Sequence, residues 1–270
     1  SPEHLTMVRR AIKKPYGIIL ISGPTGSGKS TTLYSMLNEI DRETKNVLSL
    51  EDPVEFNIEG MSQSQVRPEI NYTFATGLRT TLRQDPDIIM VGEIRDKETA
   101  ALAVQAALTG HLVLSTIHTN NAVGVIPRLI DMGVDPYLIA PTLILAMAQR
   151  LVRTLCPNSG KPLPIEGSIK QFVEGKFTDL PPTIRESIMP KENLYGILPT
   201  AECPNGTRGR MAVFEMFEMD RNLEQSILRK ATEPEIRDIV RKKGMISLQE
   251  DAIIKCSKAL IPFEEVNTLA

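Results

Sequence analysis

Uninterrupted apolar runs alternate with helix-like segments between residues 17 and 155. The run Ile88–Val91 is apolar at every position, which is typical of a strand buried on both faces. Lys97–Leu108 is rich in Ala and Leu and is soon followed by Gly110, which predicts a helix with a glycine stop. This alternation predicts an α/β fold around a parallel sheet. Its candidate strands are Gly17–Ser22, Asn46–Glu51, Asp87–Gly92 and His111–His118.

Two further helices are expected after the last of these strands. One covers about Asn121–Met132 and stops at Gly133, with Pro127 kinking it or ending its first turn. Asp135 followed by Pro136 predicts the capped start of the other helix.

The pattern changes after Cys156. Eight of the chain's 19 prolines fall between Pro157 and Pro204, which predicts a loop-rich insertion or a small subdomain with a candidate helix near Ile169–Lys176. Farther on, apolar positions recur at helical spacing and predict a small helical C-terminal domain. Three sets carry this spacing: Leu223, Ile227 and Leu228; Ile236, Ile239 and Val240; Leu248, Ala252 and Ile253. The expected domains are residues 1–155, 156–210 and 211–270.

Composition excludes several classes of protein. A net charge of -2 gives no basic field, and 4% aromatic residues with no Trp argue against a nucleic-acid partner. Three cysteines, an odd number, predict no disulfide framework and favour a reducing cytoplasm. The longest apolar stretch, Leu138–Ala148, is interrupted by Pro141 and is too short to span a bilayer.

A glycine-rich segment follows the first candidate strand and precedes a helix-like segment. Its spacing, G-x-x-x-x-G-K-[ST], in that setting predicts a phosphate-binding loop, whereas an ordinary Gly/Ser turn is the alternative. Backbone N–H groups would hold the phosphates, Lys29 would reach the β- and γ-phosphates, and Ser30 would ligate Mg²⁺. The loop residues are Gly23, Pro24, Thr25, Gly26, Ser27, Gly28, Lys29, Ser30 and Thr31. The chain is therefore expected to bind a nucleoside triphosphate.

Polar groups also follow or flank the other three candidate strands. They lie in Leu50–Glu55, Asp85–Asp96 and Gly110–Asn120. Ligands of open α/β folds bind beyond the ends of such strands, so these segments are candidates for the second half of the site.

The four segments together resemble the secretion-type ATPase superfamily, and within it the motors of bacterial type II secretion and type IV pilus assembly. In that family they are the Walker A, Asp, Walker B and His boxes. The stretch Leu82–Asp96 carries much of the resemblance, and Gln149–Arg153, which reads Q-R-L-V-R, favours the assembly and secretion branch. The resemblance implies a RecA-like P-loop core and hydrolysis of the ATP phosphoanhydride bond.

The resemblance also implies roles for single residues. Glu93 would orient or activate the attacking water, with Glu51 helping to place water and Asp52 holding Mg²⁺ through water. His118 would sense the γ-phosphate. Arg79 and Arg83, four apart and expected on one helical face, could supply positive charge across a subunit boundary.

A structural role is the ordinary alternative for each of these side chains. A strand-end Glu is often simply exposed, a histidine is often structural, and Arg79 and Arg83 could form a solvated face or ion pairs. His111, at the entry to its strand, is a weaker candidate than His118.

The chain departs from the family at the position of a zinc site. Relatives in this branch commonly carry two C-x-x-C pairs, whereas here Cys156 is followed at the second ligand position by Ser159, and the later region retains only Cys203. Two thiolates make a poor zinc site, so zinc is expected to be absent. Cys256 is expected in the core. The family's N-terminal nucleotide-clamping domain is not recognised either; only Pro2–Lys14 precedes the first strand.

The function implied is that of a homohexameric, Mg²⁺-dependent ATPase that powers type IV pilus assembly or type II secretion. It would be cytoplasmic and peripheral at the inner membrane, bound to a membrane platform protein. The alternatives are a pilus-retraction or DNA-uptake motor, and a nucleotide-gated scaffold with little turnover.

Overall fold

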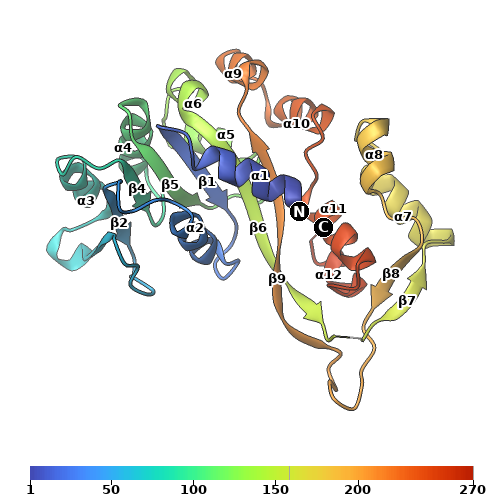
Figure 1. Ribbon diagram of the computed structural model, residues 1–270. Helices are drawn as coiled ribbons and strands as arrows, with labels where there is room; N and C mark the ends of the chain where they lie inside the picture. The colour runs from blue at the N-terminus through green and yellow to red at the C-terminus, as the bar shows by residue number, and fades with distance from the viewer. Residues whose placement is uncertain (158, 270) are drawn as a thin grey trace. The chain divides into compact units, whose positions relative to one another are not determined.

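A mostly parallel sheet forms the centre of the computed structural model, which describes residues 1–157 and 159–269 (Figure 1). The sheet has seven strands in the order β3-β2-β4-β5-β1-β6-β9. The pairs β1–β5, β1–β6, β2–β3, β2–β4 and β4–β5 are parallel. The predicted α/β class is therefore confirmed. The strands are β1 (Gly17–Ser22), β2 (Val47–Glu51), β3 (Ser62–Gln65), β4 (Ile88–Val91), β5 (Leu112–Ile117), β6 (Leu143–Leu155) and β9 (Thr207–Glu218).

The chain divides into two compact units. The first contains Ser1–Pro24, Lys29–Ala148 and Met216–Ile236, and the second contains Thr25–Gly28, Gln149–Glu215 and Arg237–Ala270. Strands β6 and β9 contribute residues to both units. The expected division into three domains stays a prediction.

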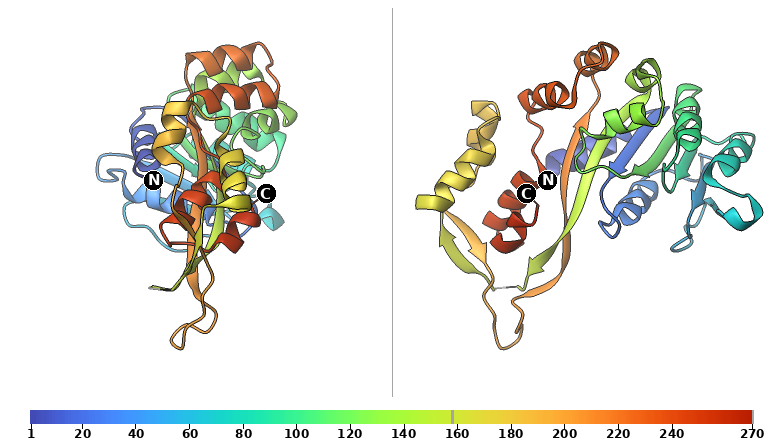
Figure 2. Two further views of the ribbon diagram at one scale, coloured as in Figure 1. Left: turned by 90° about the vertical axis from the view of Figure 1, so that its right-hand side faces the viewer. Right: turned by 180° about the vertical axis from the view of Figure 1, so that it is seen from behind.

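Helices cover both faces of the sheet in the first unit (Figures 1 and 2). The chain moves along the sheet from β1 to β2 through α2, and it returns to β4 through α3, to β5 through α4, and to β6 through α5 and α6. Because crossovers between parallel strands are right-handed, α2 lies on one face and the returning helices lie on the other. The helices are α1 (Pro2–Ala11), α2 (Lys29–Asn38), α3 (Phe74–Thr81), α4 (Lys97–Leu108), α5 (Val125–Asp131), α6 (Pro136–Thr142) and α9 (Arg221–Leu228).

The predicted helices of this unit begin where their caps place them. Asp96 accepts from the Thr99 backbone N–H at 2.8 Å and starts α4. Asp135 caps α6, whose first position is Pro136. Helix α5 is shorter than expected and begins at Val125, so Pro127 lies in its first turn, where a missing N–H has no intrahelical partner to lose.

The second unit contains a two-stranded antiparallel sheet and several helices. Strands β7 (Lys161–Pro164) and β8 (Asn193–Gly196) pair with each other, and α11 packs against α7, β8 and α12. The proline-rich stretch forms these two strands and two helices, and α7 confirms the helix expected near Ile169–Lys176. The second helix and the two strands were not expected. The helices of the unit are α7 (Gly167–Phe177), α8 (Pro182–Ile188), α10 (Glu233–Lys242, which begins in the first unit), α11 (Leu248–Ser257) and α12 (Phe263–Asn267).

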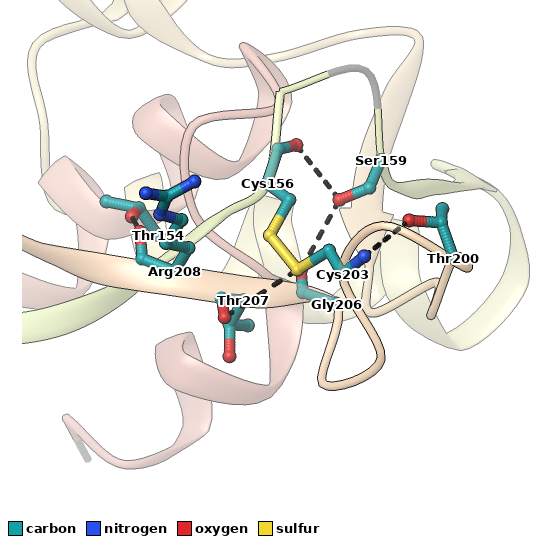
Figure 3. The surroundings of a disulfide bond; sticks show 8 residues. All are labelled: Thr154, Cys156, Ser159, Thr200, Cys203, Gly206, Thr207 and Arg208. Carbon is teal, nitrogen blue, oxygen red and sulfur yellow. Dashed lines mark hydrogen bonds between the residues drawn. A yellow bond between two sulfur atoms is a disulfide. The ribbon is translucent and has the colours of Figure 1, made fainter.

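A disulfide joins Cys156 to Cys203 (Figure 3). The expectation that the cysteines form no disulfide is therefore wrong for this pair. Ser159 stands where the family pattern has a cysteine; its hydroxyl lies 2.9 Å from the Cys156 carbonyl oxygen and 3.3 Å from that of Gly206. The Ser159 side chain therefore hydrogen-bonds the backbone beside the disulfide. Cys256 is the free, buried cysteine, as predicted.

Candidate functional site

The order of the strands brings the four predicted segments to one edge of the sheet. Strands β2, β4, β5 and β1 are consecutive neighbours and run parallel. Their carboxyl ends therefore lie together, and each is followed by one segment: Glu51 ends β2, Glu93 follows β4, His118 follows β5, and the glycine-rich loop follows β1. The backbone between β4 and α4 bridges this edge, because the Gly92 N–H donates to the Leu50 carbonyl and the Ile94 N–H to that of Thr116.

The glycine-rich loop has the local geometry of an anion cradle. Gly26 and Gly28 have φ angles of +78° and +85°, a region that side chains rarely adopt, and α2 begins at the next residue, Lys29. The Lys29 ammonium donates to the carbonyl oxygens of Gly23 at 2.9 Å and Pro24 at 3.0 Å. The hydroxyl of Ser27 is buried and has no hydrogen-bond partner among the described residues. An orphaned hydroxyl, a lysine and a helix N-terminus fit a triphosphate.

Glu93 is held by donors on both carboxylate oxygens. Its Oε1 lies 2.5 Å from Nε2 of His118, and its Oε2 accepts from Nε of Arg95 at 2.6 Å. The side chain is 13% exposed, so it is mostly shielded from water yet not sealed in the core. Each oxygen has one donor, so the carboxylate keeps acceptor capacity for a further hydrogen bond.

His118 connects Glu93 to the glycine-rich loop. Its Nδ1 lies 3.0 Å from the Gly23 carbonyl oxygen. Since a carbonyl oxygen only accepts, Nδ1 is the donor in this contact, and Nε2 faces the Glu93 carboxylate. One side chain thus contacts both the loop that would hold phosphate and the acid expected to act on water.

Asp52 lies at the same edge and is accessible. Its carboxylate is 3.7 Å from Nη1 of Arg95, which thereby faces two acids. Ser30, at the start of α2, is exposed. No group of three or more His, Cys, Asp or Glu side chains suited to a metal occurs in the described ranges. A hydroxyl and a carboxylate suit Mg²⁺, which keeps several waters of its own.

Glu51 differs from the other acids because it is buried and its hydrogen-bonding capacity is used. It accepts from Ser49 at 2.6 Å, from Gln63 at 2.9 Å and from the Tyr34 hydroxyl. Burial, with the hydrogen bond to Glu51, raises the pKa of Tyr34 to about 12. This arrangement anchors β2, and no oxygen of Glu51 is left without a donor.

Arg79 and Arg83 do not share a helical face, contrary to the expectation. Helix α3 ends at Thr81, and Arg83 lies in the turn that follows. Arg79 forms an ion pair with Glu98 at the start of α4.

Other polar residues of the quoted motifs lie at the opposite edge of the sheet. Asp87 precedes β4 and accepts from the Asn46 backbone N–H at 2.8 Å, a bond that lowers the pKa of its carboxyl. His111 precedes β5, and its Nδ1 lies 2.9 Å from the Ala106 carbonyl oxygen in the last turn of α4. These residues brace loops and lie away from the proposed chemistry.

Arg95 is, with Arg79 and Arg83, one of the arginines that the sequence offers as positive charge opposite the γ-phosphate, and it lies at this edge. It lies within the quoted Walker B stretch, so the signal for its presence was available. Its partners, Glu93 and Asp52, belong to different strand ends, and only the strand order shows that one guanidinium reaches both.

Comparisons with known proteins identify the family of the chain. A family model described as "Type II/IV secretion system protein" matches residues 1–268. The chain is 46% identical over 258 residues to the type II secretion system ATPase E of Vibrio cholerae, covering 96% of the chain and 49% of that relative. It is 43% identical over 272 residues to the type IV pilus assembly ATPase PilB of Thermus thermophilus, covering 98% of the chain and 29% of PilB.

A solved structure extends the likeness to three dimensions. The pilus retraction motor PilT with bound ADP superposes with a TM-score of 0.68 at 26% identity, over the whole of this chain and 64% of PilT. The chain spans about half the length of the type II secretion relatives it matches.

Proposed function

The chain belongs to the type II/IV secretion system protein family, and from that membership we propose that it is the ATP-hydrolysing core of a motor for type IV pilus assembly or type II secretion. The relatives named as a type II secretion ATPase and a pilus assembly ATPase, at 46% and 43% identity, support this branch. The retraction motor PilT, at 26% identity, supports the retraction alternative only weakly.

The observation that carries the proposal is the meeting of three groups at one sheet edge. The glycine-rich loop, Glu93 and His118 follow three neighbouring parallel strands, and His118 contacts both of the others. Phosphoryl transfer to water needs bound phosphates, an acceptor for the water proton and a group that responds to the γ-phosphate. These three elements supply those functions.

Each residue has a role in the proposed reaction. Gly23–Thr31 binds the triphosphate, and the Lys29 ammonium turns from its own loop carbonyls to the phosphates. Glu93 orients the water and takes its proton as the water oxygen attacks the γ-phosphorus and the bond to the ADP oxygen breaks. His118 leaves Glu93 when the γ-phosphate offers it a better acceptor. Glu51 acts indirectly by holding β2, and Arg79 and Arg83 supply positive charge to a neighbouring site.

Ser30 and Asp52 are the residues that would hold Mg²⁺, with Asp52 reaching it through water. A bound Mg²⁺ would neutralise charge on the phosphate oxygens as it develops. Arg95, between Asp52 and Glu93, keeps these two acids from repelling each other in the free protein.

The proposal extends to fold and assembly. A RecA-like P-loop core fits the sheet order and the loop after β1, and a homohexamer fits a motor whose arginines act on a neighbouring subunit. We place it at the cytoplasmic face of the inner membrane, on a platform protein. None of the described helices is long and apolar enough to cross a bilayer.

Phosphate release from Mg²⁺-ATP tests the catalytic assignment. Glu93→Gln is expected to keep ATP bound, measured by calorimetry, and to lose turnover by about a hundredfold or more, the scale of a lost general base. Glu43→Gln, at an exposed position before β2, is the matched control and should keep the parent rate.

Two outcomes would redirect the proposal. Equal turnover of Glu93→Gln and the parent would make Glu93 structural. If the parent binds ATP but does not hydrolyse it, and Lys29→Ala no longer binds ATP, the nucleotide-gated scaffold would be favoured.

A further inference from the structure

A buried amide lies under the glycine-rich loop. Gln149 is 2% exposed, and its Nε2 donates to the Ser27 carbonyl oxygen at 2.8 Å. Both residues belong to the second unit. A buried glutamine is uncommon and is retained where its amide satisfies a backbone group. Here that group is a carbonyl in the middle of the loop.

Gly28 packs directly on the same strand. A Cβ at Gly28 would lie 2.9 Å from Nε2 of Gln149 and 3.5 Å from Cδ1 of Leu151. Gln149 and Leu151 are two apart on β6, so their side chains leave the strand on the same face. The loop thus packs on the side chains of Gln149 and Leu151. Glycine is required at position 28 both by its φ of +85° and by this close approach.

The hydrogen bond has a directional consequence. The Ser27 carbonyl and the Gly28 N–H belong to one planar peptide, and in a trans peptide the two groups point in opposite directions. When Gln149 holds the carbonyl toward β6, the Gly28 N–H is held away from β6. That N–H is one of the donors that a phosphate-binding loop presents to its anion.

We propose that Gln149 is a positioning residue for nucleotide binding: its buried amide sets the orientation of the Ser27–Gly28 peptide, so that the loop is arranged before phosphate arrives. The inference rests on the proposed function, because it takes the loop to bind nucleotide. It also gives a physical role to the first residue of the Q-R-L-V-R segment.

A loop that is ordered before the ligand arrives binds more tightly, because no free energy is spent on ordering it during binding. Replacement of Gln149 should therefore change the nucleotide affinity and KM. Gln149→Met keeps the length and volume of the side chain and removes the donor. We expect the dissociation constant for ADP to rise about tenfold, the scale of one hydrogen bond to a buried acceptor. KM for ATP should rise in parallel while kcat changes less than about twofold.

Gln171→Met is the matched control because it makes the same substitution at an exposed position of α7. It should bind ADP as the parent does. Hydrogen exchange followed by mass spectrometry on the peptide that contains Gly28 gives a readout independent of turnover: exchange should quicken in Gln149→Met and stay slow in Gln171→Met.

The outcomes separate this inference from the proposed function. If the parent fails to bind ADP, the proposed function fails. If the parent binds ADP and Gln149→Met binds it equally well, with unchanged exchange, the positioning role is overturned and the function stands. Should Gln149→Met not fold, Gln149→Glu keeps size and polarity but cannot donate when ionised; a larger loss of ADP affinity supports the role, and an unchanged affinity rejects it.

Discussion

Several side chains at the carboxyl edge of the sheet already form hydrogen bonds or ion pairs within the protein. Glu93 is bonded to His118 and Arg95, and Lys29 is bonded to carbonyls of its own loop. Nucleotide binding therefore has to exchange contacts as well as add them. His118 makes two such contacts, so its substitution should lower turnover although the side chain is partly exposed.

Histidine provides a matched comparison across the sheet. His118→Gln should lower phosphate release by at least about tenfold, because it breaks the link between the loop and Glu93, whereas ADP affinity should change little. His111→Gln, at the opposite edge, should leave turnover at the parent level. Steady-state assays of both variants decide the point, and equal rates for the two would remove His118 from the mechanism.

A buried thiol makes the stability depend on pH in the alkaline range. Burial raises the pKa of Cys256 from 9.0 to about 11. The unfolded thiol ionises first, so its contribution to stability is complete below pH 9 and is lost as pH rises to about 11. Urea unfolding should show the parent losing about 3 kcal/mol more than Cys256→Ala across this interval. Parallel curves for the two proteins would contradict the assignment.

At the scale of elements, local signals predicted some segments and missed others for physical reasons. Strands β1, β2, β4 and β5 and helix α4 carry strong apolar runs or clear stops, and they appear within a residue of their expected ends. Strand β6 was hidden because its apolar residues continue from α6, which ends at Thr142. Strand β3 is short and polar, so nothing in its own sequence marks it.

The site shows the same division between local and distant information. Position after a strand indicated Glu93, His118 and the loop. Strand order, which no local pattern contains, decided which of them meet. Glu51 could not be distinguished from Asp52 by sequence, since its burial depends on Tyr34 and Gln63 from other elements.

The helices α10 and α11 are joined by a buried ion pair. Arg241 donates to both carboxylate oxygens of Glu250 at 2.6 Å, and Glu250 also accepts from the Ser247 N–H at 2.7 Å. The side chains are 4% and 1% exposed. Removing one partner leaves an uncompensated buried charge, which costs far more than the pair contributes.

We therefore expect Glu250→Gln to lower the free energy of unfolding by about 3 kcal/mol. Lys242→Gln, at an exposed position on α10, should change it by less than about 0.5 kcal/mol. Denaturant unfolding of both variants measures the difference. A loss as small as that of the control would show that water reaches the pair.

At the scale of the whole molecule, two arginines that are candidates for the site already pair with acids of their own chain. Arg79 pairs with Glu98, and Arg95 pairs with Glu93 and Asp52. Transfer of a phosphoryl group needs positive charge opposite the charge that develops on it. A neighbouring copy in a ring would meet that need at every interface.

Specific ATPase activity should accordingly rise with protein concentration, with the monomer nearly inactive. Sedimentation and phosphate release measured over one dilution series test this directly. If activity per chain stays constant while the protein remains monomeric, one chain contains all the chemistry.

The disulfide between Cys156 and Cys203 joins residues that are 47 positions apart and closes a covalent ring, which contains β7, β8, α7 and α8. A tension applied along the polypeptide would enter this ring at one sulfur and leave at the other. Strands β7 and β8 and helices α7 and α8 would carry none of the load. The fully extended polypeptide would be shorter by about 160 Å than it would be without the disulfide, at ~3.5 Å for each bypassed residue. In a molecule proposed to do mechanical work, this segment is thus insulated from pulling while the strands on either side of it transmit the force.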